Sequence, residues 1–442
     1  MNVLFISLGC DKNLVDSEMM LSMLRAKGHE FTDDEYEADA VVVNTCCFIG
    51  DAKEESINVL LEMGQLKAEG SLKYLIATGC LAQRYQEEIQ TEIPEVDAII
   101  GTTAIDAIVD CIDKLEAGNP ANYYKDINAK PVSKVGRVLT TGGHFAYLKI
   151  AEGCDKHCTY CIIPKARGHV RSKPLKDIER ELESLLSHGY NEVVLAGINL
   201  PFYGRDLGLS LINAVELSCD IMPRVRLSSL EPELLSREDV ERLAKLPNFC
   251  PQFHLSLQSG CDRTLNRMRR RYNTDMYREV VKNIREFFPE GSLTTDVIVG
   301  FPGETDEDFE ESCRFIEEMG FAKVHVFPYS RRTGTDAADM PDQIPNSVKT
   351  ERAAKMAERA DAIRQKFLAE QVGKTESVLI ESVIKDGMMN GYTMNYTPVV
   401  IPAVKSLLCT VQEVVITGVS GDVCTGRIKN PPVGYDPMGM FE

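Results

Sequence analysis

Short apolar runs alternate with helical stretches in two separate series along this chain, and no other feature constrains its fold as strongly. In the first series, which ends near residue 108, the apolar runs are NVLFIS, DAVVVN, KYLIAT and DAIIG. Continuous apolar runs of this length are typical of parallel strands that are buried on both faces. Because helical stretches such as SEMMLSMLRAKG separate the runs, the sequence predicts a doubly wound α/β domain over residues 1–116.

A second series begins after residues 117–143, a stretch rich in proline, glycine and asparagine that is predicted to be a linker. The six predicted strands cover residues 145–150, 192–197, 224–229, 252–257, 294–300 and 322–330. The helices predicted between them cover residues 177–189, 237–246, 275–288 and 306–320. Six β/α units predict a partial (β/α)6 barrel of the TIM type over residues 144–346, with its chemistry at the carboxyl ends of the strands.

The last part of the chain contains two further sequence patterns, a charged helical stretch and then a series of strand-like runs. Residues 347–372 form a charged, amphipathic stretch with few helix breakers, which predicts a connecting helix. Residues 373–442 contain the strand-like runs ESVLIESVI, NGYTMNYTPVVI and LCTVQEVVITGV, separated by turns that contain glycine. These runs predict a small β-barrel. The predicted fold class is therefore α/β, followed by a small all-β domain.

Composition excludes several classes of protein. The net charge of −18 opposes nonspecific binding to nucleic acid, which depends on neutralising phosphates. No apolar run approaches 18 residues, so no membrane span is expected. The first residues, MNVLFISLGCDKN, lack a basic segment and a cleavage site of small residues, which predicts a cytoplasmic protein without a signal peptide. In that reducing compartment the 14 cysteines are expected to be metal ligands or core residues, not disulfides.

Three cysteines stand on one short loop directly after the first predicted barrel strand. The loop reads EGCDKHCTYCIIP, and we call Cys154, Cys158 and Cys161 the barrel triad. A structural zinc site usually takes four protein ligands. An iron–sulfur cluster takes one ligand per iron, so three thiolates on a four-iron cluster leave one iron open to a small molecule. The spacing favours such a cluster, with an incomplete zinc site as the alternative.

Three more cysteines each follow a predicted strand of the first domain. They lie in SLGC, NTCC and ATGC, and we call Cys10, Cys46 and Cys80 the N-terminal triad. The carboxyl ends of parallel strands meet at one edge of a sheet, so these thiols are expected to converge there. Cys47 could replace its neighbour Cys46 as a ligand. The remaining cysteines are predicted to be core or incidental residues: Cys111, Cys219, Cys250, Cys261, Cys313, Cys409 and Cys424.

The segment EGCDKHCTYCIIPKARG resembles the CxxxCxxC signature of radical S-adenosylmethionine enzymes. With the N-terminal triad upstream and a TRAM-like barrel downstream, the whole chain resembles the methylthiotransferase family of those enzymes. The resemblance implies a [4Fe-4S] cluster on each triad, S-adenosylmethionine as cofactor and an electron donor as partner. In this family the barrel cluster cleaves S-adenosylmethionine, the resulting radical takes a hydrogen atom from the substrate, and the second cluster supplies sulfur.

The resemblance also implies which residues contact S-adenosylmethionine. Tyr160, before the last cysteine of the loop, is expected near the adenine. Gly197, Ile198 and Asn199, at the end of the second barrel strand, are expected beside the amino group of the methionine part. Glu231, after the third strand, is a candidate for the polar end of the methionine. No side chain is predicted to be catalytic in its own right.

The family divides by substrate, and the sequence points both ways. The stretch SLGCDKNLVDSE and the cysteine loop resemble the RimO branch, which modifies the β-carbon of an aspartate on a small-subunit ribosomal protein. From Asn191 onward, stretches such as AGINLPFYGRDL and HVFPYSRRTGT resemble the MtaB branch, which modifies threonylcarbamoyladenosine beside the tRNA anticodon. RimO would also be expected to show Gln-Asp where Ile198-Asn199 stands.

Charged and aromatic side chains only partly distinguish between tRNA and a ribosomal protein as the substrate. Five arginines between residues 263 and 271 form a basic cluster that could meet phosphate. Tyr392, Asn395 and Tyr396 could read RNA by stacking and hydrogen bonding. Against this, the last domain has five Lys/Arg and seven Asp/Glu, which suits a basic protein partner. The sequence reading favours tRNA as substrate, with a small-subunit ribosomal protein as the alternative.

Two functions of other classes fit part of the pattern. A zinc-dependent hydrolase would use the same cysteines but would be colourless and need no reductant. A noncatalytic RNA-binding or scaffold protein would keep one structural cluster, and loss of Cys154 would then alter stability without abolishing any modification. Neither alternative accounts for two separate sets of three cysteines.

Overall fold

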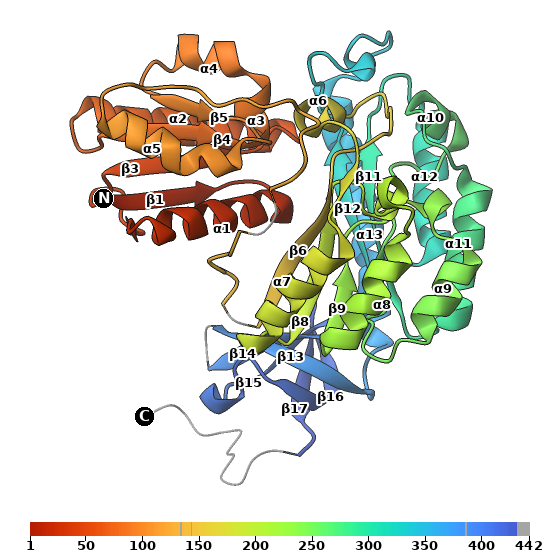
Figure 1. Ribbon diagram of the computed structural model, residues 1–442. Helices are drawn as coiled ribbons and strands as arrows, with labels where there is room; N and C mark the ends of the chain where they lie inside the picture. Colours follow the sequence, from red (N-terminus) through yellow and green to blue (C-terminus); the bar gives the residue numbers. More distant parts are fainter. Residues whose placement is uncertain (133–134, 143, 385–386, 431–442) are drawn as a thin grey trace.

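A computed structural model describes residues 1–132, 135–142, 144–384 and 387–430. Figure 1 shows three bodies along the chain: an α/β domain at the amino end, a larger barrel of strands and helices beside it, and a small β-barrel beneath the larger one. The end of the predicted domain 373–442, from residue 431 onward, lies outside the described residues. Among the residues that the structure describes, no helix is long and apolar enough to cross a membrane.

The first body is a parallel five-stranded sheet with helices on both faces, as predicted. The strand order is β2-β1-β3-β4-β5. The strands are β1 (Asn2–Ser7), β2 (Glu30–Phe31), β3 (Ala40–Thr45), β4 (Tyr74–Thr78) and β5 (Ala98–Ile100). The helices are α1 (Asp11–Ala26) and α5 (Ile108–Glu116) on one face and α2 (Gly50–Ala68), α3 (Gly79–Arg84) and α4 (Gln86–Glu92) on the other. Because the chain reverses direction across the sheet at β1 and β3, ligands are expected at the carboxyl ends of these strands.

The second body is the partial barrel of six parallel strands that the sequence predicts. The strands are β6 (Phe145–Glu152), β8 (Glu192–Gly197), β9 (Arg224–Leu227), β10 (Gln252–His254), β11 (Ser292–Val299) and β12 (Lys323–Pro328). They form two parallel groups, β6-β8-β9 and β10-β11-β12, linked by short bridges such as Leu230 with Leu255. Alternate strand residues face the outer helices, so the apolar core lies between strands and helices and the lumen stays polar.

One helix of this barrel is absent from the prediction. The outer helices are α7 (Leu175–Ser187), α8 (Leu211–Ile221), α9 (Arg237–Ala244), α11 (Thr274–Phe287), α12 (Asp306–Met319) and α13 (Asn346–Ala369). The missed outer helix is α8, with the sequence LINAVELSCDI, although Asn213, Glu216 and Asp220 recur at helical spacing on one face. Shorter elements are α6 (Ile163–Arg167), β7 (Arg171–Ser172) and α10 (Asp262–Arg267). The predicted connecting helix is α13, and its Met356 and Ala360 belong to the core of the barrel.

The third body is a closed five-stranded barrel in the order β13-β14-β15-β17-β16. The strands are β13 (Thr375–Ile384), β14 (Met388–Thr393), β15 (Pro398–Pro402), β16 (Val411–Ser420) and β17 (Val423–Ile428). The run NGYTMNYTPVVI, predicted as one strand-like segment, is two antiparallel strands joined by a tight turn in which Tyr396 has φ 62°. Strand β17 is a further element that the sequence reading missed.

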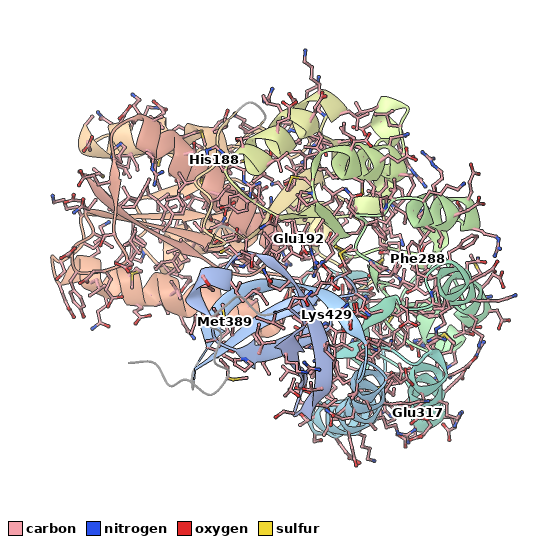
Figure 2. The ribbon with its side chains drawn as sticks, turned by 90° about the horizontal axis from the view of Figure 1, so that it is seen from below. His188, Glu192, Phe288, Glu317, Met389 and Lys429 are labelled. Atoms are coloured by element: carbon pink, nitrogen blue, oxygen red, sulfur yellow. The ribbon has the colours of Figure 1, made fainter. Side chains whose placement is uncertain are left out.

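This small barrel covers the amino ends of the strands of the large one. The Asn191 amide donates a hydrogen bond to the Cys409 carbonyl at 2.7 Å, and the Ser292 hydroxyl donates one to the Asn395 carbonyl at 2.5 Å. Figure 2, seen from below, shows the small barrel in front of the large one, with Glu192 at their junction. The face that carries the barrel triad therefore lies at the opposite end and stays open.

The predicted linker lies along the first domain. Tyr123 forms a bridge with Ile100 at the edge of the sheet, and Arg137 pairs with the buried carboxylate of Glu18 on α1. The described part of this segment is therefore ordered by specific contacts. The exact domain limits at residues 116, 143, 346 and 372 stay predictions.

Candidate cofactor sites and the cavity between the domains

The loop of the barrel triad leaves strand β6 through a glycine that no other residue could replace without strain. Gly153 has φ +74°, and a Cβ atom at this position would lie 1.9 Å from the carbonyl oxygen of His169. The Cys154 amide then donates a hydrogen bond to the Gly168 carbonyl at 2.9 Å. The chain thus turns sharply at the carboxyl end of β6, which brings the three thiols to the open face of the barrel.

Loops that follow other strands hold this segment in place. The Thr159 amide and hydroxyl donate to the carbonyls of Met268 and Arg267 at 3.1 and 3.0 Å. Arg332, after β12, donates to the Tyr160 carbonyl at 2.7 Å. These bonds involve backbone atoms of the loop, so they fix its path and leave the sulfur atoms to other partners.

Nitrogen donors approach two sulfur atoms of the barrel triad. Cys154 Sγ accepts from the side-chain amide of Asn199 at 3.3 Å, and Cys158 Sγ accepts from the guanidinium of Arg270 at 3.2 Å. Burial raises the pKa of Cys154 and raises that of Cys161 to about 12. Without a metal these thiols therefore keep their protons, and metal binding would release them, as is usual for buried thiolate sites.

The residues predicted to bind S-adenosylmethionine surround this loop. Tyr160 is buried edge-on against Phe301, with ring centroids 6.3 Å apart. Gly197 ends β8, and the Ile198 amide donates to the Ala151 carbonyl at 3.4 Å. Asn199 turns its amide nitrogen to Cys154, and its buried side-chain oxygen has no hydrogen-bond partner among the described residues. An acceptor left unpaired at this depth is suited to a polar ligand group.

Glu231 lies in the same place but is already engaged by two cations. Its carboxylate pairs with Arg270 and with Lys156, whose Nζ lies 2.8 Å away. Lys156 also pairs with Glu233. The sequence reading missed Lys156, although it lies inside the quoted cysteine loop, and it considered Arg270 only as a phosphate contact. A ligand carboxylate would suit these two cations better than its ammonium group would suit Glu231.

The N-terminal triad gathers at the carboxyl ends of β1, β3 and β4. Gly9 has φ +87°, and a Cβ there would lie 2.7 Å from Cys46 Sγ, so only glycine lets the two loops approach so closely. The Asn13 amide donates to the carbonyls of Leu8 and Thr45 at 3.0 and 3.1 Å, which ties both loops to α1. Cys80, at the start of α3, has its sulfur 3.9 Å from the Asn13 side-chain oxygen.

Burial also dominates the chemistry of these thiols. It raises the pKa of Cys46 to about 11, and it raises that of Cys80, where the Arg167 guanidinium partly offsets the effect. Cys47 points into the apolar cluster around Leu81 and Ile162, and burial raises its pKa to about 12. Cys47 is therefore a core residue in this structure. The assignment of the six triad cysteines as ligands stays a prediction.

The short helix α6, which follows the barrel triad in the chain, lies between the first domain and the large barrel (Figure 1). Ile162 and Ala166 pack into the apolar cluster that contains Cys80. The Thr102 hydroxyl, after β5, donates to the Ala166 carbonyl at 3.0 Å. Arg167, the last residue of α6, donates from Nε to Cys80 Sγ at 3.2 Å. Segments far apart in sequence thus meet at one junction, as the two-cluster hypothesis requires.

A cavity of about 290 Å³ lies inside the large barrel and touches all three bodies. Its lining includes Lys12 from α1, Tyr147 and Arg226 from the barrel strands, and Glu381 and Tyr396 from the small barrel. Lys12 follows Cys10 by two residues, so the cavity begins next to the N-terminal triad. Its volume accommodates a side chain or a nucleobase.

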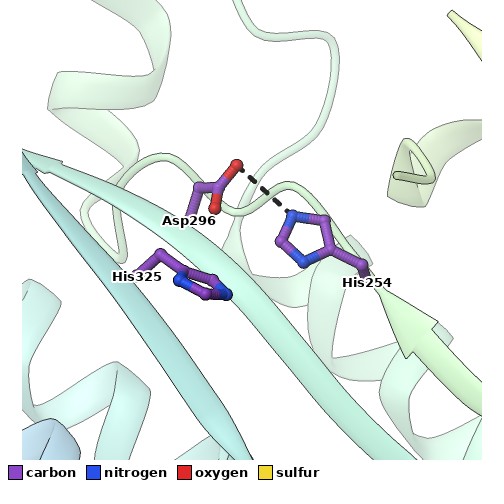
Figure 3. Close-up of side chains that lie close together, drawn as sticks. All are labelled: His254, Asp296 and His325. Carbon is purple, nitrogen blue, oxygen red and sulfur yellow. Dashed lines mark ion pairs between the residues drawn. The ribbon is translucent and has the colours of Figure 1, made fainter. Parts of the chain in front are cut away.

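Figure 3 shows a second group of side chains in the lumen, on neighbouring strands β10, β11 and β12. His254 Nε2 lies 3.3 Å from the Asp296 carboxylate, and His325 lies opposite Asp296 in the strand register. The His254 Nδ1 atom is 3.0 Å from the Thr294 hydroxyl. Burial raises the pKa of Asp296, but the hydrogen bond and charge of His254 outweigh it, so that the net shift is downward. Among the described residues, only these three have ligand atoms within 4.8 Å of one another. The two cysteine triads are not expected to form so compact a group, because the thiolates of a [4Fe-4S] cluster bind separate irons and lie further apart than the ligands of one ion.

The basic cluster expected to meet phosphate is largely neutralised within the protein. Arg263 pairs with Asp308 at 2.6 Å, Arg269 pairs with Asp336, and Arg270 is buried against Glu231. Arg267 donates to the Pro302 carbonyl at 2.9 Å. A phosphate contact is therefore excluded for the buried Arg270, whereas Arg263 and Arg269 stay more than half exposed and a phosphate contact there stays a prediction.

The predicted RNA-reading group of the small barrel is also occupied. The Asn395 amide donates to the Glu290 carbonyl at 2.8 Å, and its side-chain oxygen accepts from Thr393 and Thr397. Tyr392 and Tyr396 stack on each other with ring centroids 4.3 Å apart, and the Arg226 guanidinium lies 3.7 Å above the Tyr396 ring. Asn395 is therefore not available to bases, whereas Tyr396 is 42% exposed and lines the cavity, so stacking on this ring stays a prediction.

Comparisons with known proteins agree with this architecture. The model of the Radical SAM superfamily matches residues 148–316, and that of the uncharacterized protein family UPF0004 matches residues 2–101. The chain is 45% identical to the ribosomal protein uS12 methylthiotransferase RimO of Lachnoclostridium phytofermentans over 90% of this chain and 92% of that protein. It is 41% identical to RimO of a Thermoanaerobacter species, over 88% of this chain and 90% of that protein.

Solved structures share the fold at low identity. Radical S-adenosylmethionine methyltransferase TsrM from Kitasatospora setae, with cobalamin and a [4Fe-4S] cluster bound, superposes with a TM-score of 0.56. The alignment covers 76% of this chain and 77% of that one at 13% identity. The cobalamin-dependent radical enzyme OxsB gives a TM-score of 0.51 at 13% identity, over 80% of this chain and 56% of that one. At such identities the likeness shows the fold alone.

The whole-length relatives define the class: this chain belongs to the radical S-adenosylmethionine methylthiotransferase family. It is therefore a transferase, and its cofactors are [4Fe-4S] clusters and S-adenosylmethionine, as predicted. The relatives carry the RimO name, which corresponds to the alternative that the sequence left open, and they lend no support to tRNA as substrate.

Proposed function

We propose that this enzyme methylthiolates the β-carbon of an aspartate on the small-subunit ribosomal protein that corresponds to uS12. The observation that carries the proposal is the 45% identity to a uS12 methylthiotransferase over 90% of the chain. The structure supports it at two residues, because Arg270 and Asn395, which could have contacted RNA, are buried in internal contacts. A cytoplasmic location follows for an enzyme that acts on a ribosomal protein.

The proposal assigns one [4Fe-4S] cluster to the barrel triad and a second to the N-terminal triad. Both sets offer three sulfur atoms and nitrogen donors aimed at sulfur, from Asn199 and Arg270 in one site and from Arg167 in the other. Such donors favour the anionic sulfur of a bound cluster. When bound, the clusters and S-adenosylmethionine supply the one-electron chemistry and the sulfur that an unactivated C–H bond requires. An external electron donor is part of the proposal.

The protein's own residues orient the reactants. Asn199 offers its unpaired side-chain oxygen to the polar end of S-adenosylmethionine, and Tyr160 limits the space beside the cluster. The cavity below receives the target side chain. Lys12 and Arg226 lie in its wall, paired with Asp11 and Glu192, and the proposal requires one of them to exchange its partner for the carboxylate of the target aspartate.

The test of the substrate is deletion of the gene followed by mass spectrometry of ribosomal proteins and of tRNA nucleosides from the same cells. We expect the ribosomal protein to lose the 46 Da or so of one methylthio group while the nucleosides are unchanged. Complementation with Cys154→Ala should not restore the mass, whereas Cys111→Ala, a core change remote from both triads, should restore it. Loss of a 2-methylthio nucleoside with an unchanged ribosomal protein refutes the substrate and points to the tRNA branch.

The test of the cluster sites is iron content after anaerobic reconstitution. Two cubanes give about eight irons per chain. Replacement of all three cysteines of either triad by alanine should leave about four, and Cys111→Ala should leave the value unchanged. A wild-type value near four contradicts the assignment of the second cluster.

A further inference from the structure

A buried arginine stands between the two proposed cluster sites. Arg167 is the last residue of α6, six positions after Cys161, and it is 1% exposed. Its Nε donates to Cys80 Sγ at 3.2 Å, and Nη2 donates to the Asn13 side-chain oxygen at 2.6 Å. Its Nη1 donates to Asp16 at 2.8 Å. One guanidinium therefore touches the N-terminal triad while its backbone belongs to the loop of the barrel triad.

The charges around Arg167 are balanced without the sulfur. Lys149 and Arg167 are the two buried cations, and Asp16 and Glu152 are the two carboxylates that pair with them. If Arg167 served only to join the domains, its ion pairs with these two carboxylates would be sufficient, and it would need no contact with the Cys80 sulfur. The remaining N–H of Nε points to Cys80, and a neutral thiol is a weak acceptor. An anionic sulfur is a strong acceptor, so this contact is suited to the cluster-bound form of Cys80.

A second arginine of the same segment provides a contrast. Arg171 donates to the backbone carbonyls of Ile127, His169 and Arg167, at 2.8, 3.0 and 3.1 Å. It thus supports the loop through backbone contacts. The two arginines are four residues apart, and only the first has a recorded hydrogen bond to a triad sulfur among the described contacts.

We propose that Arg167 is a positioning residue of the N-terminal cluster: its hydrogen bond to the Cys80 sulfur raises the reduction potential of that cluster, and its attachment to α6 keeps the two cluster sites facing each other. This inference rests on the proposed function, because it requires a cluster on the N-terminal triad. Hydrogen bonds to cluster sulfurs stabilise the reduced, more negative state and so shift the potential upward.

The experiment compares Arg167→Lys and Arg167→Gln with the matched control Arg171→Gln, all as reconstituted full-length enzyme. The readouts are iron content and a redox titration followed by electron paramagnetic resonance. The signal that responds to added S-adenosylmethionine belongs to the barrel cluster, and the other signal reports the N-terminal cluster. Lysine keeps the charge but cannot place an N–H at the Nε position, so it separates the hydrogen bond from the charge.

We expect both Arg167 variants to lower the potential of the N-terminal cluster by a tenfold or larger change in the equilibrium constant, about 59 mV for one electron. The control should leave it unchanged. Loss of four irons with a normal barrel signal also supports the inference. If Arg167→Gln does not fold, Arg167→Lys decides. Full iron and an unchanged potential in Arg167→Lys overturn the inference alone, whereas wild-type protein with only about four irons overturns the proposed two-cluster function as well.

Discussion

Replacement of Arg224 by methionine should loosen the small β-barrel from the large one, and the effect can be worked out from the contacts of one side chain. Arg224 is buried at the amino end of β9, where it pairs with Glu192 at 2.9 Å. Its guanidinium also donates to the carbonyls of Ser377, Tyr392 and Thr393 in the small barrel, at 3.3, 3.2 and 3.1 Å. Methionine keeps the apolar stem and removes all four contacts.

The cost follows from the number and the length of these bonds. A hydrogen bond from a charged donor contributes roughly 1.5–3 kcal/mol. The three bonds to the small barrel are longer than the usual charge-assisted distance of about 2.7–2.9 Å, so each is assigned the roughly 1 kcal/mol of an ordinary hydrogen bond. Glu192 keeps Arg226 as a partner at 2.7 Å, which limits the penalty for its buried carboxylate. The docking free energy should therefore fall by about 3 kcal/mol.

Hydrogen exchange measures this loss directly, and it suits a chain that has no tryptophan for fluorescence. A change of about 3 kcal/mol corresponds to roughly 100-fold less protection of the amides in the turn at residues 394–397, which lies between the barrels. The control is Arg242→Met, whose pair with Glu216 is about one third exposed and should contribute little. Protection in Arg224→Met within threefold of wild type would refute the view that this arginine fastens the small barrel.

Three further predictions concern other sites. Burial and the nearby Glu192 raise the pKa of Glu381 to about 7. An ionised carboxyl is therefore disfavoured in the folded state, and the free energy of unfolding falls as pH rises from about 4.5 to 7. In urea unfolding, Glu381→Gln should be about 2 kcal/mol more stable than wild type at pH 8 and equal to it at pH 4. Cys46→Ala should lose about four irons and Cys47→Ala none, and equal losses would show that Cys47 can serve as a ligand. Gly153→Ala places a Cβ 1.9 Å from the His169 carbonyl oxygen, so it should abolish iron binding at the barrel triad while the N-terminal site stays loaded.

Periodicity predicted most of the fold because it reports burial. Strand β8 was predicted with its observed limits, since EVVLAG is buried at every position. Helix α8 was missed although its sequence carries a helical period, in which Asn213, Glu216 and Asp220 recur on one face and mostly apolar residues fill the other. Its capping box, Ser210 with Asn213, was an available signal. The turn before β15 was not predicted because Tyr396 occupies the position of positive φ, where glycine is the residue expected in such a turn.

The candidate site was predictable where cysteines follow strands and unpredictable where charges cross between bodies. Spacing alone placed Cys10, Cys46 and Cys80 at one sheet edge, because parallel strands end together. The partners of these thiols, Asn13 and Arg167, lie in the quoted motifs, but their contacts span 154 residues of sequence. For the same reason the arginines near residue 270 looked free in sequence and are paired in the fold. The preference for tRNA rested instead on the resemblance of the stretches after Asn191 to the MtaB branch.

The junction between the first domain and the large barrel holds the two proposed cluster sites in a fixed relation to each other. It is built from buried ion pairs of Arg167 and Lys149 with Asp16, and the linking segment adds the pair of Arg137 with Glu18, where apolar contacts would cost less to bury. Apolar surfaces tolerate sliding, whereas a buried charge that shifts loses its partner at a cost of about 3–5 kcal/mol. The pairs therefore fix the relative position of the two domains more than they add to the free energy of unfolding. The proposed reaction passes between two sites and requires that relative position, so it depends on the buried ion pairs of the junction as well as on the cysteines.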